Sequence, residues 1–203
     1  MSEQEGYFFK AITGKQSFEE TTIAIAYDME ASGHYSDALE IWIKLAEKGN
    51  AEAQFNLALL YIDGCGTSQN SSLAAKHLEK SAKQGYSPAQ VELGNLYLAG
   101  EGVEENHDKA ISWFRKAADQ GDPIGTHNLG TMYRDGLGVA ESEEESIRWF
   151  LIAAKANYSL AQYEMGLICT DRKDEPQAIK WFRLAAAQDL DEAKLELQSR
   201  GIE

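Results

Sequence analysis

The sequence predicts an all-α fold: a right-handed α-solenoid (superhelix) of antiparallel helix pairs. Three blocks of 36 residues follow one another without a gap, at 51–86, 87–122 and 123–158, and a shortened block occupies 159–190. A fixed period of this length is typical of a repeat array, in which each unit packs on its neighbours. Each block contains two helical stretches, and no segment shows the sustained alternation of a half-buried strand, so we expect no sheet.

The first helix of a repeat is illustrated by the second block. Ser87 is expected to cap it, Gln90 to reach back, and Pro88 suits the first turn, where its missing N–H was unpaired anyway. Gly94 leaves room for a neighbouring helix to approach closely. The apolar residues of this helix fall on one stripe, formed by Ala89, Leu93, Leu96 and Tyr97.

A glycine loop follows the first helix. Gly100 ends the helix in a left-handed conformation, and Gly102 allows a second unusual backbone angle. The same structural loop is predicted at Gly64, Gly66, Gly100, Gly102, Gly136 and Gly138. A second helix begins near Asn106 and is stopped by Gly121. Its buried stripe is Ala110, Trp113, Phe114, Ala117 and Ala118, and the bulky pair recurs as His77-Leu78, Trp149-Phe150 and Trp181-Phe182.

The repeats are predicted to form a single domain over residues 17–203. Its parts are a degenerate unit (17–50), three full units (51–86, 87–122 and 123–158), a shortened unit (159–190) and a C-terminal capping helix (191–203). In the shortened unit, residues 169–173 replace the tyrosine and the glycine loop, which predicts a tighter turn. The N-terminal segment, residues 1–16, carries Tyr7, Phe8 and Phe9, and we expect it either to cap the first helix or to be mobile.

Composition and charge exclude several classes of function. The chain has 203 residues and a net charge of −14, which argues against nucleic acid, because a phosphate-binding surface needs clustered Lys and Arg. The acidity either attracts a basic partner or keeps an exposed array in solution. No signal peptide or membrane-spanning run is visible, so we expect a cytoplasmic protein. The two cysteines occupy different repeat positions and suggest no disulfide framework.

The residues that attract a catalytic interpretation have simpler structural ones. The glycine loops follow helices rather than strands, and no two histidines have the spacing of a zinc protease. Cys65 has no local basic activator, and His77 occupies a position that is tryptophan in other repeats. The run 141–145 is either a helix cap made by Ser142 or, with Glu101, Glu104 and Glu105, an acidic edge for a metal or a basic partner. We therefore expect no enzyme activity, no cofactor and no metal.

The segment LGNLYLAGEGVEENHDKAISWFRKAADQGD closely resembles the Sel1-like repeat family, a relative of the tetratricopeptide repeats. The family pattern is met three times in register and covers residues 51–190. The resemblance implies an adaptor or scaffold without chemistry of its own. Some cysteine-rich secreted members have been linked to penicillin binding or β-lactamase activity, but this chain lacks their paired cysteines, and that activity is not carried over.

Resemblance to tetratricopeptide arrays also implies that the first helix of each unit lines a concave face. The partner-binding residues expected there are Tyr27, Phe55, Leu59, Ile62, Val91, Asn95, Leu98, His127, Thr131, Arg134, Tyr163 and Leu167. The apolar ones either form an exposed groove or are covered by neighbouring helices. A groove of this kind takes an extended peptide or an amphipathic helix.

The leading hypothesis is therefore a non-catalytic adaptor or scaffold that binds a peptide or protein partner in the concave groove. The alternative is an immunity or inhibitor protein that neutralises a basic effector or toxin, and a hydrolase is a remote third hypothesis. In each case we expect no nucleic acid and no membrane insertion, and the first two involve no small-molecule substrate.

Overall fold

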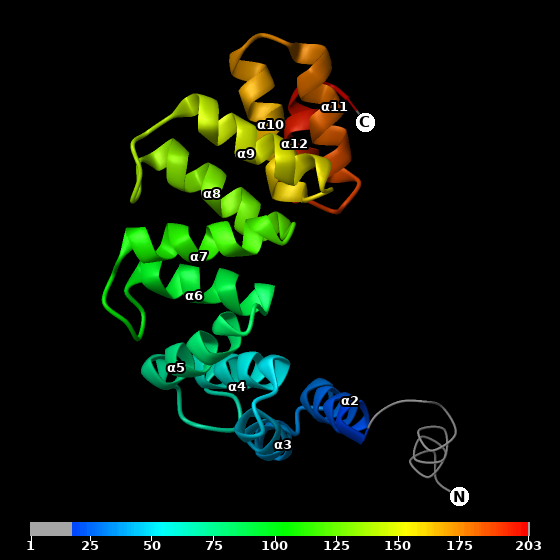
Figure 1. Ribbon diagram of the computed structural model, residues 1–203. Helices are drawn as coiled ribbons and strands as arrows, with labels where there is room; N and C mark the ends of the chain where they lie inside the picture. The colour runs from blue at the N-terminus through cyan, green and yellow to red at the C-terminus, as the bar shows by residue number, and fades with distance from the viewer. Residues whose placement is uncertain (1–17, 203) are drawn as a thin grey trace, which may run out of the picture. The chain divides into compact units, whose positions relative to one another are not determined.

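The computed structural model describes residues 18–202, and within that range the chain forms eleven helices and no strand (Figure 1). The predicted all-α solenoid of paired helices is confirmed. The predicted segment 1–16 lies outside the described residues. The helices are α2 (Phe18–Ala31), α3 (Tyr35–Glu47), α4 (Ala51–Asp63), α5 (Ser71–Lys83), α6 (Ser87–Ala99), α7 (His107–Asp119), α8 (Pro123–Asp135), α9 (Glu143–Lys155), α10 (Ser159–Asp171), α11 (Glu175–Ala186) and α12 (Asp191–Ser199).

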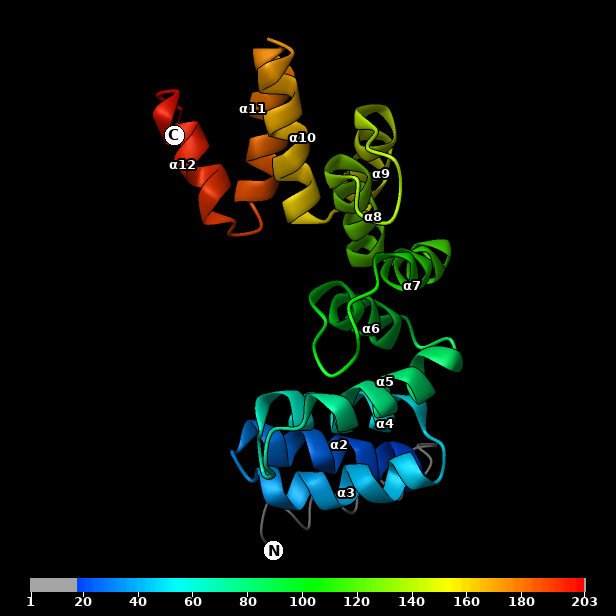
Figure 2. The same cartoon turned by 90° about the vertical axis from the view of Figure 1, so that its left-hand side faces the viewer.

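The described chain divides into two compact units. Unit 1 runs to Ala89 and includes Glu101–Val103, whereas unit 2 comprises Gln90–Gly100 and the chain from Glu104 onward. Within unit 1, α3 packs against both α2 and α4, and α4 packs on α5; Figure 2 shows α2, α3 and α4 side by side. Within unit 2, each helix from α7 to α12 packs on the next one along the chain. Sequential pairing of this kind is the contact pattern of a repeat array.

In the four repeats between residues 51 and 190, the second helix starts at the same kind of cap, whereas α3 has no side-chain cap. The side-chain oxygens of Asn70, Asn106, Ser142 and Asp174 each accept a hydrogen bond from the backbone N–H three residues on. This confirms the predicted start near Asn106 and the interpretation of Ser142 as a helix cap. The first helix of the second repeat differs from expectation. It begins at Ser87 itself, so Ser87 is the first helical residue.

The second glycine of each loop is required by a close approach of two backbones. A Cβ on Gly102 would lie 2.2 Å from the Ser71 carbonyl oxygen, and one on Gly138 would lie 2.8 Å from the His107 carbonyl. Both glycines also have positive φ angles, near 70°. Each loop therefore rests on the start of the second helix in the preceding repeat, and only glycine fits.

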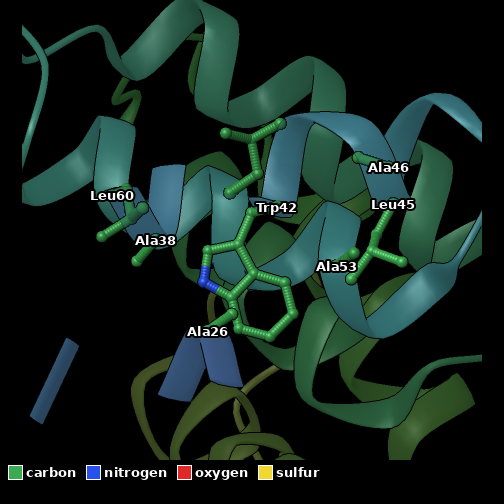
Figure 3. Packing of buried hydrophobic residues seen from close by; sticks show 8 residues of the cluster. Ala26, Ala38, Trp42, Leu45, Ala46, Ala53 and Leu60 are labelled. Atoms are coloured by element: carbon green, nitrogen blue, oxygen red, sulfur yellow. The ribbon is translucent and has the colours of Figure 1, made fainter. Parts of the chain in front are cut away.

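A large fully buried side chain forms the centre of each repeat. In unit 1 this residue is Trp42, which packs among small and aliphatic side chains that include Ala26, Ala38 and Leu60 (Figure 3). In unit 2, Phe114 is equally buried, and a Cβ on Gly94 would lie 2.5 Å from its ring. The predicted close approach at Gly94 is therefore confirmed. The same pairing joins Gly130 to Phe150 and Gly166 to Phe182.

The C-terminal part of unit 2 follows the predicted departures from the repeat. Between α10 and α11 the chain turns within three residues, with Lys173 in a left-handed conformation at φ 60°. This is the tighter turn that the missing glycine loop predicts. The last described helix, α12, buries Ala193 and Leu197 against the core, so both side chains point inward as predicted.

Candidate protein-interaction surface

In unit 1 the predicted partner-binding residues share one face of the first helices. Phe55, Leu59 and Ile62 follow one another on α4 at helical spacing, and all are half-buried. Tyr27 on α2 is 42% exposed and is joined to α4 by hydrogen bonds. We call Tyr27, Phe55, Leu59 and Ile62 the first-helix face of unit 1.

A group of aromatic and polar side chains lies on this face. The Tyr27 hydroxyl donates to Glu52 Oε1 at 2.8 Å and accepts from Asn56 Nδ2 at 2.9 Å. The rings of Phe55 and Tyr86 lie 5.4 Å apart. We call Tyr27, Glu52, Phe55, Asn56 and Tyr86 the aromatic–acidic cluster. Tyr27 is also packed edge-on against the buried Trp42 ring at 5.1 Å, which ties the cluster to the core of the unit.

The carboxylate of Glu52 influences both tyrosines of the cluster. Burial raises the pKa of Tyr27 to about 12, and the hydrogen bond and charge of Glu52 add to that rise. Burial and the same charge raise the pKa of Tyr86. Within residues 18–202, no Lys, Arg or His side chain forms an ion pair with Glu52, so its charge is balanced only by neutral donors.

In unit 2 the corresponding positions are occupied differently. Val91 is only 6% exposed and belongs to the interior, and Leu98 packs on the core of the second repeat. For Val91 the expected alternative of cover by neighbouring helices applies, whereas Leu98 is half-buried. Asn95 receives a hydrogen bond from Asn128 on α8 at 3.3 Å and donates one to Glu92. The hydrogen bond between Asn95 and Asn128 therefore joins adjacent first helices and uses polar groups of this face within the unit.

His127 is held between aromatic rings in unit 2. Its ring lies 5.2 Å from Phe150 and 5.3 Å from Tyr158, and its backbone oxygen accepts a hydrogen bond from the hydroxyl of Thr131 at 3.5 Å. Burial lowers the pKa of His127, which favours the neutral ring. Its role is therefore one of packing, together with a weak contact to Asn128.

The remaining predicted residues of unit 2 are also engaged within the unit. Arg134 pairs with Glu164 on the next first helix at 3.0 Å and lies over the Phe150 ring. Tyr163 and Leu167 pack partly on the last core cluster. The face of unit 2 is thus largely occupied by its own side chains.

Sequence reasoning missed two features of the structure. Glu52, Asn56 and Tyr86 were missed because the count took only the Phe55, Leu59 and Ile62 positions of α4, and Tyr86 lies after α5 at the end of the same repeat. A second missed feature is a recurring glutamine pair, in which an exposed glutamine just after the second helix donates a hydrogen bond to a buried glutamine of a first helix. It joins Gln84 to Gln54, Gln120 to Gln90 and Gln188 to Gln162. The recurrence of Gln at fixed spacing was the available signal.

The residues considered for chemistry have structural roles. His77 is half-buried and stacks on Tyr61 at 5.8 Å, and burial lowers its pKa. Burial raises the pKa of the Cys169 thiol, which disfavours the reactive thiolate. Across residues 18–202, no three His, Cys, Asp or Glu side chains converge as a metal site would require. None of the helices in that range has both the length and the apolar character needed to cross a membrane.

Across residues 18–202 these features define an all-helical repeat protein. The sequence model of the Sel1 repeat matches residues 51–86, 87–122, 123–158 and 154–190, and the chain therefore belongs to the Sel1 repeat family. Sel1 repeat proteins are generally scaffolds for interactions between proteins, and they are typically non-catalytic. No match was found among curated proteins.

Solved structures support the same assignment. A protective antigen of uropathogenic Escherichia coli strains, with an SLR fold, is 35% identical at a TM-score of 0.74 over 81% of this chain. The match spans only 37% of the antigen's own length. A Sel1 repeat protein from Oxalobacter formigenes is 28% identical at a TM-score of 0.79, over 86% of this chain and 73% of that one. An immunity protein from Pseudomonas aeruginosa shares the fold at 24% identity and a TM-score of 0.57, covering 78% of this chain and 60% of its own.

Proposed function

We propose that the chain is a non-catalytic interaction protein that binds a peptide segment of a partner protein along the first-helix face of unit 1. One observation carries this proposal: apolar side chains remain partly uncovered on that face. Tyr27 keeps 42% of its surface exposed beside the half-buried stripe of Phe55, Leu59 and Ile62. Aromatic and aliphatic side chains gathered on one surface are typical of interaction sites.

The shape of the face suits a peptide chain. The stripe runs along α4, and Tyr27 lies beside it on α2, so the apolar groups follow a line rather than a closed cavity. An extended segment can cover such a line with every second side chain, and an amphipathic helix can cover it with one side chain from each successive turn. The residues that anchor Tyr27, Asn56 and Trp42, are buried, so the face is held in place before a partner arrives.

The test is selection from a display library of random peptides, followed by truncation of the face. Peptides selected on the wild-type protein are expected to bind the double variant Phe55→Ala/Leu59→Ala at least about tenfold more weakly, because the buried apolar area is lost. The variant leaves the net charge unchanged. Fluorescence anisotropy measures the affinity, and circular dichroism checks that helicity is retained.

Leu184→Ala is the matched control. This leucine is 40% exposed on α11 in unit 2, so its truncation removes similar apolar area elsewhere. It is expected to leave the affinity unchanged. Equal binding by the double variant and the wild-type protein, or selection of no peptide at all, would contradict the proposed surface.

A second candidate is an inhibitor that neutralises a basic protein, as an immunity protein does. The observation in its favour is the net charge of −14 together with exposed carboxylates on two loops, at Glu104, Glu105 and Glu141. Binding through such loops is expected to weaken steeply with salt, because exposed charges are screened. Capture of a partner that survives high salt but fails with Phe55→Ala/Leu59→Ala favours the peptide-binding surface instead.

A further inference from the structure

We propose that the aromatic–acidic cluster of unit 1 receives a basic side chain of the bound segment, with arginine preferred over lysine. This inference rests on the proposed function, since it concerns the same face. It adds the chemical identity of one partner residue and the group that recognises it, the carboxylate of Glu52.

Glu52 is prepared to accept a donor. Its Oε1 atom receives the Tyr27 hydroxyl at 2.8 Å, while Oε2 accepts no hydrogen bond from any residue between 18 and 202. The Tyr27 hydroxyl is itself fixed by Asn56, whose side chain is 6% exposed. The carboxylate is therefore oriented by a buried amide through a tyrosine, and one oxygen remains open to a ligand.

The surroundings of this oxygen suit a cation. Glu52 lies close enough to both Tyr27 and Tyr86 for its charge to raise their pKa values. The Tyr86 ring packs on Phe55, and the cluster therefore offers aromatic faces beside a carboxylate. A guanidinium group stacks on rings and donates to a carboxylate at the same time, whereas an ammonium is a more strongly hydrated point charge.

The same protein fills a comparable arrangement with its own arginine in unit 2. Arg200 lies 4.9 Å from the centre of the Phe182 ring, and its guanidinium donates to Glu175 and Glu196. Arg134 likewise lies over Phe150 and pairs with Glu164. In unit 1, no described cation takes this place at Glu52, so a ring-and-carboxylate site is left without the partner that the other unit supplies internally.

The experiment is a double-mutant cycle on peptides selected by the first-helix face. Each selected peptide is expected to contain an arginine or lysine whose replacement by glutamine weakens binding to the wild-type protein by about tenfold. On the Glu52→Gln variant, which keeps an acceptor for Tyr27, the same peptide change is expected to have little effect. Replacing the peptide arginine by lysine is expected to give an intermediate loss.

Glu40→Gln is the charge-matched control. Glu40 is an exposed residue of α3 in the same unit, so the variant removes one negative charge without touching the cluster. It is expected to preserve the dependence on the peptide's basic residue, which separates a local contact from general attraction to an acidic protein.

The outcomes separate this inference from the proposed function. Peptides that need Phe55 and Leu59 but no basic residue would overturn the assignment of Glu52 and leave the peptide surface standing. Equal effects of Glu52→Gln and Glu40→Gln would overturn it as well. If no peptide binds the face, the proposed function and this inference both fail.

Discussion

The two units use the same helix pair but leave their first helices in different states. In unit 1, Tyr27 and its neighbours keep apolar area and one carboxylate oxygen open. In unit 2, Asn95 pairs with Asn128, and Arg134 pairs with Glu164, each across adjacent first helices. The helix register is shared, so the difference lies in which side chains the repeats place at equivalent positions.

This contrast shows how a repeat array acquires a binding surface. Positions that face the next first helix can either bond to it or remain open, and substitution at a few positions decides which. The cores differ in the same way. Unit 2 combines Gly94 with Phe114, whereas Ala58 and Leu78 occupy the equivalent positions in unit 1. In unit 1 the first helix carries the larger residue, Ala58 instead of Gly94, and the second helix carries the smaller one, Leu78 instead of Phe114. The two changes offset each other and keep the interior filled.

The largest expected effect is a loss of stability at the second glycine of the loop. This glycine lies close to the backbone of the preceding repeat, a feature that the repeats share. Gly102→Ala is expected to lower the free energy of unfolding by about 3 kcal/mol, because its Cβ meets the Ser71 backbone and its φ angle is positive. Gly85→Ala is the control, with a positive φ and open space around it, and is expected to cost about 1 kcal/mol. Urea unfolding measures both. Equal losses would show that backbone strain alone explains the glycine.

The next effect tests whether the two units fill their cores with matched residue pairs, Gly94 with Phe114 in unit 2 and Ala58 with Leu78 in unit 1. Gly94→Ala places a methyl group against the Phe114 ring and is expected to cost about 1–2 kcal/mol after the gain in helix propensity. Adding Phe114→Leu, which reproduces the Ala58 and Leu78 combination, is expected to recover about 1 kcal/mol of that loss. If the double variant loses as much unfolding free energy as the two single variants together, the proposed matching of residue sizes at positions 94 and 114 is contradicted.

The smallest expected effect is a pH dependence of stability caused by His127. The equivalent residue in unit 1 is Phe55, which does not titrate. Its folded-state pKa lies below 6.5, so the neutral ring contributes stability above pH 6.5, and this contribution is lost as the pH falls from 6.5 through the folded-state pKa. The variant His127→Phe should lose less stability over this range than the wild-type protein. Urea unfolding at several pH values provides the comparison, and identical pH profiles would count against it. The ring faces Asn128, Phe150, Tyr158, Glu164 and Arg134.

Much of the fold follows from local signals in the sequence. The cap at Asn106, the stop at Gly121 and the tight turn that replaces the glycine loop depend on residues close in the chain, and the structure confirms them. The room left by Gly94 was also predictable, since a glycine inside a helix costs stability and needs a packing reason. What could not be predicted is the particular partner of a side chain that reaches another repeat.

The surface illustrates this limit. Helical counting placed Tyr27 and Val91 alike on the expected concave face, but Tyr27 is exposed and Val91 is buried. The count did not include Glu52, Asn56 or Tyr86. Exposure depends on how far neighbouring helices cover a position, and that coverage changes from repeat to repeat with side-chain size. Sequence spacing gives the direction of a side chain and not the distance to its neighbours.

The sequence by itself determined the repeat fold and the family: a 36-residue period with helix caps and glycines at fixed offsets is typical of a helical repeat array, and the Sel1 repeat model matches residues between 51 and 190. Only the tertiary structure decided which first-helix residues stay open and which pair across repeats. The physical reason is that hydrogen bonds such as those from Tyr27 to Glu52 and from Arg134 to Glu164 join residues 25 and 30 positions apart. Such bonds form only where the packed helices bring the two atoms within about 3 Å of each other.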